Sequence, residues 1–148
     1  MADRVIEHTT IGAAPDAVRA VLLDFTRYPD WAPDLKEVEV LSTDEEGRGT
    51  SVRFRAAGFG KSTSYTLSYD YSDPTVLAWT LTEGDITRKL DGFYELLEGD
   101  EPGTTDVTYQ LEADLIVPIP GFIKRRTQGR IMHTALRELK SRVEQRTP

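Results

Sequence analysis

The sequence predicts an α+β fold in which a seven-stranded, curved antiparallel sheet wraps around one long C-terminal helix. Six segments between Glu37 and Leu115 alternate apolar and polar residues and are separated by short turns. The last stretch, Phe122–Arg146, repeats apolar residues at helical spacing. A sheet with one apolar face needs a cover on that face only, and this helix is the long element available to provide it.

The segment before the six strands predicts one further strand and two short helices. Arg4–Ile11 is rich in Ile, Val and Thr and is typical of a strand, although its alternation is weak. Pro15 favours the first position of a helix. The apolar face of that helix consists of Val18, Val21 and Leu22. Arg27–Leu35 contains two prolines, so only a short helical turn or loop fits there.

The six alternating segments form a meander of consecutive antiparallel strands. Their predicted ranges are Glu37–Leu41, Thr50–Ala57, Ser62–Tyr71, Leu77–Leu81, Ile86–Leu96 and Val107–Leu115. Alternation is clearest in Ser62–Tyr71, where every second residue is Tyr or Leu from Tyr65 onward. Gly84-Asp85 is typical of a tight hairpin. A curved sheet of this kind leaves a space beneath the helix wherever the helix does not fill it.

The C-terminal helix has an uneven apolar stripe. Its members are Phe122, Gly129, Met132, Leu136, Leu139 and Val143. The second half is filled by large residues and is predicted to anchor the helix, whereas the first half is predicted to serve something other than the core. A glycine inside a helix costs about 1 kcal/mol relative to alanine. Either close helix–sheet packing or space for a ligand would explain Gly129, and both interpretations remain open.

Length and composition indicate one domain spanning residues 1–148. The absence of cysteine excludes disulfides, thiolate metal sites and a cysteine nucleophile. No apolar run approaches the roughly 20 residues of a membrane span, and the N-terminal residues lack a signal-peptide core. These features favour a cytoplasmic protein.

The net charge of −7 conceals an asymmetry between the last helix and the rest of the chain. From Phe122 onward there are eight basic and two acidic residues, and the residues before it carry a net charge of −13. An acidic body argues against general nucleic-acid binding. Four cations occupy the first turns of the helix, where the macrodipole disfavours them: Lys124, Arg125, Arg126 and Arg130. They either match the charge of the acidic body or dock the protein on lipid headgroups, an acidic carrier protein or an anionic ligand end.

Several possible motifs do not carry chemistry. AGFGKST, from Ala57 to Thr63, lacks the first glycine of a phosphate-binding loop and joins two strands, so it predicts a hairpin turn. The histidines are only His8 and His133, neither in a recognisable catalytic spacing, and the chain has no cysteine. We therefore expect no metal site and no cofactor. The acidic runs at 44–46 and 98–101 are typical of solvated turns.

Aromatic residues gather on the predicted inner face of the sheet and in the turn before it. They are Trp31, Phe54, Tyr65, Tyr69, Trp79, Tyr94 and Tyr109. Buried Tyr hydroxyls and Trp N–H groups require partners, so this set indicates either a core with internal partners or a cavity with a ligand. Arg88 alternates with Ile86 and Leu90 and is predicted to point inward, unless a bulge at the strand end turns it to solvent.

The order of elements resembles the helix-grip fold of the START-like (SRPBCC) superfamily. Three motifs carry the resemblance over nearly the whole chain: APDAVRAVLLDFTRYPDWAP, LAWTLTEGD followed by LDGFYEL, and VTYQLEADLIVPIPGFIKRR. The branch that it resembles is the bacterial polyketide cyclase/dehydrase-like and coenzyme-Q-binding START-like group. The resemblance implies a mostly apolar cavity, with some polar groups, between the sheet and the last helix.

These observations favour a protein that binds, and carries or presents, a hydrophobic small molecule such as a lipid, a quinone or a polyketide-like aromatic. The expected ligand-binding residues are the seven aromatics together with Arg88, Phe122, Gly129 and Met132. No nucleophile, base or metal constellation is recognised, so no catalytic residue is assigned and binding is favoured over catalysis. The resemblance also implies an alternative, a polyketide aromatase/cyclase that uses Arg88, Tyr65 and Tyr94. A third alternative is an interaction module that docks through the basic start of the helix.

Overall fold

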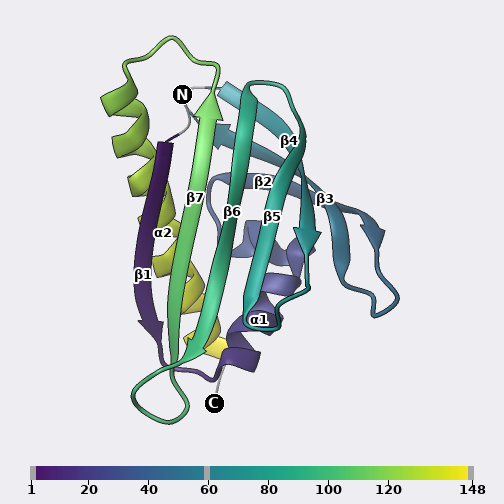
Figure 1. Cartoon of the computed structure of the whole chain (residues 1–148), viewed down its shortest axis with the longest axis vertical. Coiled ribbons are helices and arrows are strands. Elements are labelled where there is room, and N and C mark those ends of the chain that lie inside the picture. Colours follow the sequence, from purple (N-terminus) through teal and green to yellow (C-terminus); the bar gives the residue numbers. More distant parts are fainter. Residues whose placement is uncertain (1–2, 59–60, 147–148) are drawn as a thin grey trace.

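The computed structural model describes residues 3–58 and 61–146 and contains one antiparallel sheet in the order β1-β7-β6-β5-β4-β3-β2. The strands are β1 Asp3–Ile11, β2 Leu35–Thr43, β3 Gly49–Gly58, β4 Lys61–Asp70, β5 Val76–Gly84, β6 Thr87–Glu98 and β7 Thr105–Leu115. From β2 to β7, strands that follow each other in the chain pair with each other, and β1 closes the order beside β7 (Figure 1). The predicted fold class is confirmed. Phe59 and Gly60, the centre of the predicted AGFGKST turn, lie outside the described residues.

Two short helices follow β1, as the sequence predicts. The α-helix α1 spans Pro15–Leu23, with proline at its start and Val18, Val21 and Leu22 buried. A 3-10 helix, η1, covers Phe25–Asp30 and contains Pro29. Proline lacks the N–H that an α-helix would need at this position, so the chain makes only this short turn before β2.

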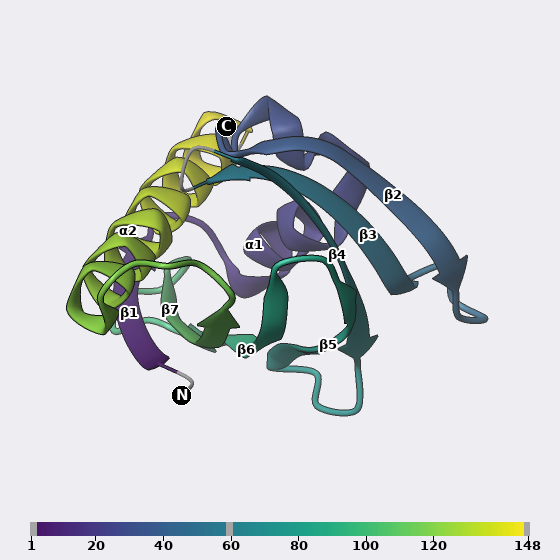
Figure 2. The same ribbon diagram turned by 90° about the horizontal axis from the view of Figure 1, so that it is seen from above.

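The long helix α2, Gly121–Arg146, lies along the edge of the sheet against β1, and its far end meets α1. Viewed from above, the sheet curves away from α2 so that β2 and β3 stand on the opposite side (Figure 2). The buried residues of α2 all belong to its second half: Met132, Leu136, Leu139 and Val143. They pack in one core with Ile11, Leu22 and Val107. The second half is therefore the anchor, as predicted.

The first half of α2 is held by polar contacts rather than by apolar packing. Phe122 is 58% exposed. The ammonium of Lys124 donates to the carbonyl of Leu115 at 3.0 Å, at the end of β7. The side-chain amide of Gln128 donates to the carbonyls of Asp3 at 3.1 Å and Leu111 at 3.0 Å. These bonds hold the start of the helix above the edge of the sheet.

Among the described residues, no helix is long and apolar enough to cross a membrane.

Candidate functional site

A cavity of about 230 Å³ lies between the concave face of the sheet and the middle of α2, from Gln128 to Ala135. All seven aromatic residues predicted for the inner side line it: Trp31, Phe54, Tyr65, Tyr69, Trp79, Tyr94 and Tyr109. The cavity is therefore a real feature of the fold, lined mainly by apolar and aromatic side chains, as small-molecule sites generally are.

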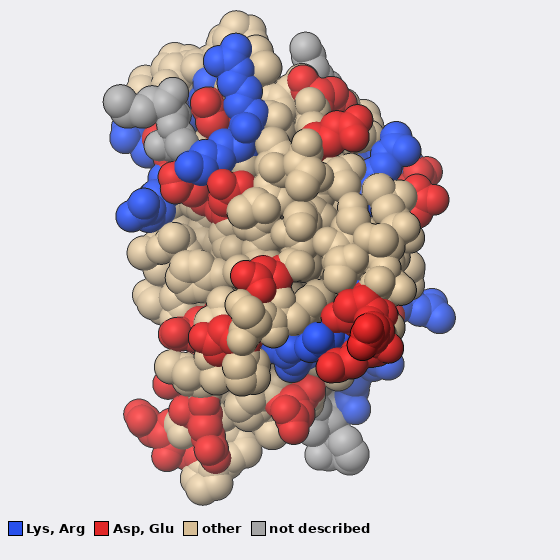
Figure 3. All heavy atoms as spheres, turned by 45° about the vertical axis from the view of Figure 1, so that its right-hand side comes forward, with Lys and Arg blue, Asp and Glu red and all other residues tan. Residues whose placement is uncertain are grey.

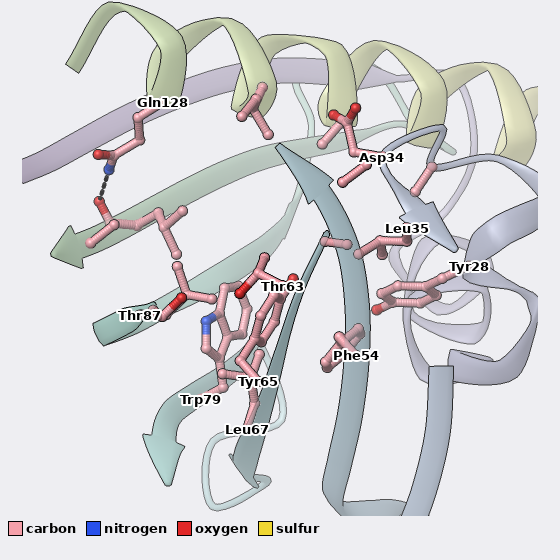
Figure 4. Close-up of a pocket in the computed structure, with 18 of the residues that line it drawn as sticks. Tyr28, Asp34, Leu35, Phe54, Thr63, Tyr65, Leu67, Trp79, Thr87 and Gln128 are labelled. Carbon is pink, nitrogen blue, oxygen red and sulfur yellow. Dashed lines mark hydrogen bonds between the residues drawn. The ribbon is translucent and has the colours of Figure 1, made fainter. Parts of the chain in front are cut away.

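The aromatic rings form a continuous wall. Phe54 stacks on Tyr65 with ring centres 5.4 Å apart, and Tyr94 stacks on Tyr109 at 4.3 Å. The indole of Trp79 lies between the two stacks, 5.5 Å from the ring of Tyr94. Figure 4 shows Tyr65, Trp79 and Phe54 side by side on the sheet, with α2 on the opposite side of the cavity. Rings in such mutual contact are preorganised to hold a flat apolar ligand.

Gly92 on β6 makes room for Trp79, which it faces in the sheet register. A Cβ on Gly92 would lie 2.3 Å from the carbonyl oxygen of Gln110 and 3.0 Å from Cζ2 of Trp79. Only glycine fits this close approach, so Gly92 fixes the position of the indole in the cavity wall.

The helix presents a different set of residues to the cavity from the one predicted. Its lining residues are Gln128, Ile131, Thr134 and Ala135. The predicted Phe122, Gly129 and Met132 do not line it. Phe122 is exposed, Met132 is fully buried in the core, and a Cβ on Gly129 would meet only Val5, at 4.0 Å. Gly129 therefore faces β1 with ordinary space around it, which contradicts the close-packing interpretation; a role in making space for a ligand stays a prediction.

Arg88 does not point into the cavity, because β6 contains a bulge. Thr87 pairs with Leu115 and Lys89 pairs with Asp114, so Arg88 is an extra residue in β6. The bulge leaves Arg88 exposed, so the structure has the solvent-facing alternative that the sequence left open and not the inward orientation. Thr87, only 5% exposed, lines the cavity in its place.

The cavity lining contains a single charged group. Neither Lys, Arg nor His is among its described residues, and Asp34, on the segment before β2, is the one carboxylate. Burial raises the pKa of the Tyr65 and Tyr69 hydroxyls well above the usual value. Burial likewise raises the pKa of Tyr109 to about 12. At neutral pH these tyrosines are uncharged and can donate hydrogen bonds.

Some buried polar groups of the cavity lining have hydrogen-bond partners within the protein and others have none. The Tyr28 hydroxyl donates to the carbonyl of Leu22 at 2.6 Å. The hydroxyls of Tyr94 and Tyr109 bond to each other. The indole N–H groups of Trp31 and Trp79 are covered and have no hydrogen-bond partner among the described residues. Since unsatisfied buried donors cost free energy, this lining is not a finished apolar core.

Asp85, in the turn between β5 and β6, ties that turn to the start of β4. Its carboxylate accepts hydrogen bonds from the Thr63 hydroxyl, from the Ser64 amide at 3.0 Å and from the Ile86 amide at 2.5 Å. The bonds from Thr63 and Ser64 lower the pKa of Asp85 below its usual value. Thr63 and Ile86 both line the cavity, so this clasp fixes the β5–β6 turn against the start of β4.

The basic start of α2 is unpaired, in contrast to its second half. Further along, Lys140 pairs with Glu144 at 2.8 Å and Arg142 with Asp30 at 3.5 Å. Three arginines at the start of the helix are exposed and form no ion pair within residues 3–58 and 61–146: Arg125, Arg126 and Arg130. Lys124 is different, because its ammonium bonds the carbonyl of Leu115. Among the described residues, direct ion pairs therefore do not account for the three arginines.

Acidic side chains lie at this end as well, since Asp3 and Asp114 line a small hollow together with Lys124 and Gln128. On the face shown in Figure 3, acidic side chains occur in both the upper and the lower half. In the described part of the chain, no group of three or more His, Cys, Asp or Glu residues is placed to hold a metal ion.

Sequence reasoning missed the cavity residues that carry little hydrophobic signal. On the helix these are Gln128, Thr134 and Ala135, which lie one or two positions before residues of the apolar stripe. On the sheet and in the segment before β2 they are Asp34, Thr63 and Thr87. The helix residues could have been found by asking which face of the helix neighbours the stripe. The inward orientation of Thr87 depends on a bulge whose position the sequence does not indicate.

The sequence matches, over residues 3–144, the protein family described as polyketide cyclase / dehydrase and lipid transport. No curated protein sequence matches it. A START superfamily protein from Mycobacterium smegmatis has a similar structure, with TM-score 0.90, 23% identity, and 97% of this chain and 99% of that one covered. The Zhui aromatase/cyclase from a Streptomyces species gives TM-score 0.83, 18% identity and coverage of 99% and 96%. A STAR-related lipid transfer protein from Xanthomonas axonopodis has a TM-score of 0.71 and 19% identity, with 95% of this chain and 85% of that one covered.

Proposed function

The chain belongs to the polyketide cyclase/dehydrase and lipid transport family, a START-like (SRPBCC) assignment, and from this premise we propose that it binds and carries or presents a hydrophobic small molecule. The observation that supports this most is the aromatic cavity of about 230 Å³ beneath α2. Its size favours a compact ring compound, quinone-like or polyketide-like, over a long acyl chain. Burying such a ligand releases about 25 cal/mol for each Å² of apolar surface removed from water.

The test is a pair of variants on α2 that add the same side chain on opposite faces. Ala135→Phe places a ring in the cavity, whereas His133→Phe places one on the exposed face. We expect wild type and His133→Phe to bind α-tetralone, a two-ring ketone, in NMR titrations. Ala135→Phe should lose at least about tenfold in affinity without losing melting temperature, because its ring occupies existing space. Equal affinity in all three proteins would refute binding in this cavity.

The family name and the Zhui aromatase/cyclase support a second candidate, cyclisation and dehydration of a poly-β-ketone. Tyr65 and Tyr94 line the cavity as that mechanism would require, but Arg88 lies outside. The lining retains hydroxyls and one carboxylate for proton transfer. Cyclised, dehydrated product that forms with wild type and is lost in Tyr65→Phe or Tyr94→Phe would establish this candidate. Tight binding of the same poly-β-ketone without turnover would support the binding and carrying function.

The exposed start of α2 supports docking on an anionic membrane surface. Phe122 is 58% exposed and Ile123 38%, and both are next to the unpaired Arg125 and Arg126. Apolar side chains flanked by arginines suit the boundary between headgroups and acyl chains. The cavity lining on α2 begins at Gln128, so a docked membrane would lie close to the cavity. We therefore favour a lipid surface over an acidic carrier protein as the partner.

Vesicle binding tests the docking surface with matched charge removals. Arg125→Ser/Arg126→Ser removes two cations at the start of α2, and Arg137→Ser/Arg146→Ser removes two near its end. Each basic residue near an anionic bilayer contributes about 1 kcal/mol, so the first pair should weaken binding to phosphatidylserine-containing vesicles by roughly 30-fold. The second pair should have little effect. If the protein binds no vesicles but binds an acidic carrier protein in a salt-sensitive way, the carrier protein is favoured as the docking partner.

A further inference from the structure

Two cavity tyrosines have hydroxyls that the protein does not use. Tyr69 is only 9% exposed, and Tyr65 stacks on Phe54 at the cavity wall. Both line the cavity, and neither hydroxyl hydrogen-bonds to another described residue. In contrast, the Tyr28 hydroxyl, in the same cavity, is held by the Leu22 carbonyl. The protein therefore satisfies one tyrosine itself and leaves two donors directed to what the cavity holds.

The same cavity offers no positive charge to a ligand. Its described lining contains no Lys, Arg or His, and its one charged side chain is the carboxylate of Asp34. A ligand carboxylate buried in this cavity would have no cationic partner and would carry a large desolvation cost. The carboxylate of Asp34 would also repel it. The three exposed arginines of α2 are not among the lining residues and do not offset this cost inside the cavity. An anionic ligand is therefore disfavoured, whereas a neutral oxygen can accept from a tyrosine hydroxyl.

Resting on the proposed binding function, we propose that the cavity selects uncharged ring compounds that carry a ketone or quinone oxygen, held by the hydroxyls of Tyr69 and Tyr65, and rejects carboxylates. Burial supports this role by keeping both hydroxyls protonated, since it raises the pKa of each. Both hydroxyls can donate, which matches a ligand whose oxygen accepts.

The experiment compares three probes of one shape at neutral pH, by NMR titration. They are tetralin, α-tetralone, and the tetralin that bears a carboxylate on the carbon where tetralone has its ketone. In wild type we expect the ketone to bind roughly 3- to 10-fold more tightly than tetralin. The carboxylate should bind at least about tenfold more weakly than the ketone. The variant Tyr65→Phe/Tyr69→Phe should bring the ketone-to-tetralin ratio close to one.

Tyr28→Phe is the matched control, because it removes a cavity hydroxyl that the protein already satisfies. It should preserve the ratio even if its melting temperature falls. A ratio unchanged in Tyr65→Phe/Tyr69→Phe, or a carboxylate that binds as tightly as the ketone, overturns this inference and leaves the binding function standing. Failure of wild type to bind any of the three probes overturns both.

Discussion

Replacing Gly129 by alanine tests how α2 lies over the sheet. Gly129 lies inside a 26-residue helix, where alanine is favoured over glycine by about 1 kcal/mol. The new Cβ would meet only Cγ1 of Val5, at 4.0 Å, which is ordinary van der Waals contact. No clash offsets the helical preference, so Gly129→Ala should stabilise the protein by about 1 kcal/mol. For a chain of this length that is a rise of about 2–4 °C in melting temperature.

Calorimetric melting and urea denaturation measure this gain, and titration with α-tetralone measures whether the cavity is affected. Affinity should be unchanged, because Gly129 does not line the cavity. Gly121→Ala is the control: its Cβ would meet nothing within 4 Å, but the residue lies at the start of the helix, where the gain in stability should be smaller. A fall in melting temperature would show that helix and sheet are packed more closely than described. Unchanged stability with lost affinity would show that this position serves the ligand after all.

Four further outcomes follow from the same structure. Gly92→Ala should destabilise by about 1–3 kcal/mol in urea denaturation, because its Cβ would lie 2.3 Å from the Gln110 carbonyl oxygen; unaltered stability would contradict the close approach to Trp79. Arg88→Ala should leave α-tetralone affinity within about twofold, since Arg88 is exposed, and a larger loss would return it to the cavity. The free energy of unfolding should fall above about pH 10, because tyrosines of the unfolded chain ionise there while burial holds the pKa of Tyr109 at about 12. The expected fall is about 1.4 kcal/mol per pH unit for each such tyrosine. Tyrosinate absorbance that appears fully at pH 10 in the folded protein would refute this. Asp85→Asn should speed hydrogen exchange at the Ser64 amide, which donates a hydrogen bond to the Asp85 carboxylate at 3.0 Å. Unchanged protection of this amide would show that the carboxylate is not needed to hold the turn against β4.

Period-two alternation placed the cavity aromatics correctly wherever the strands are regular. Phe54 on β3, Tyr65 and Tyr69 on β4 and Tyr109 on β7 all face inward as predicted, because a strand alternates faces strictly until its register is broken. The same rule fails at Arg88, where the bulge in β6 inserts one residue and exchanges the two faces. Nothing in the local sequence distinguishes this bulge from regular pairing, since it depends on how β6 meets the end of β7.

The helix shows a second limit of pattern reading. Its apolar stripe marks where α2 is anchored, and the residues of the second half, such as Leu136 and Leu139, are buried as predicted. A helix face beside a cavity does not need large apolar residues, so Thr134 and Ala135 give no signal of their role. Extending the stripe backward to Gly129 and Phe122 therefore assigned ligand contacts to residues that face β1 and the exterior.

The most direct test of the account is where a bound ring compound lies. With α-tetralone added to the isotopically labelled protein, intermolecular NOEs should connect the ligand to the methyl groups of Ala113 and Ala135, which line the cavity from β7 and α2. NOEs confined to Ile123 and Phe122, on the exposed start of α2, or no NOEs at saturating ligand, would contradict the claim that the space beneath α2 is the binding site.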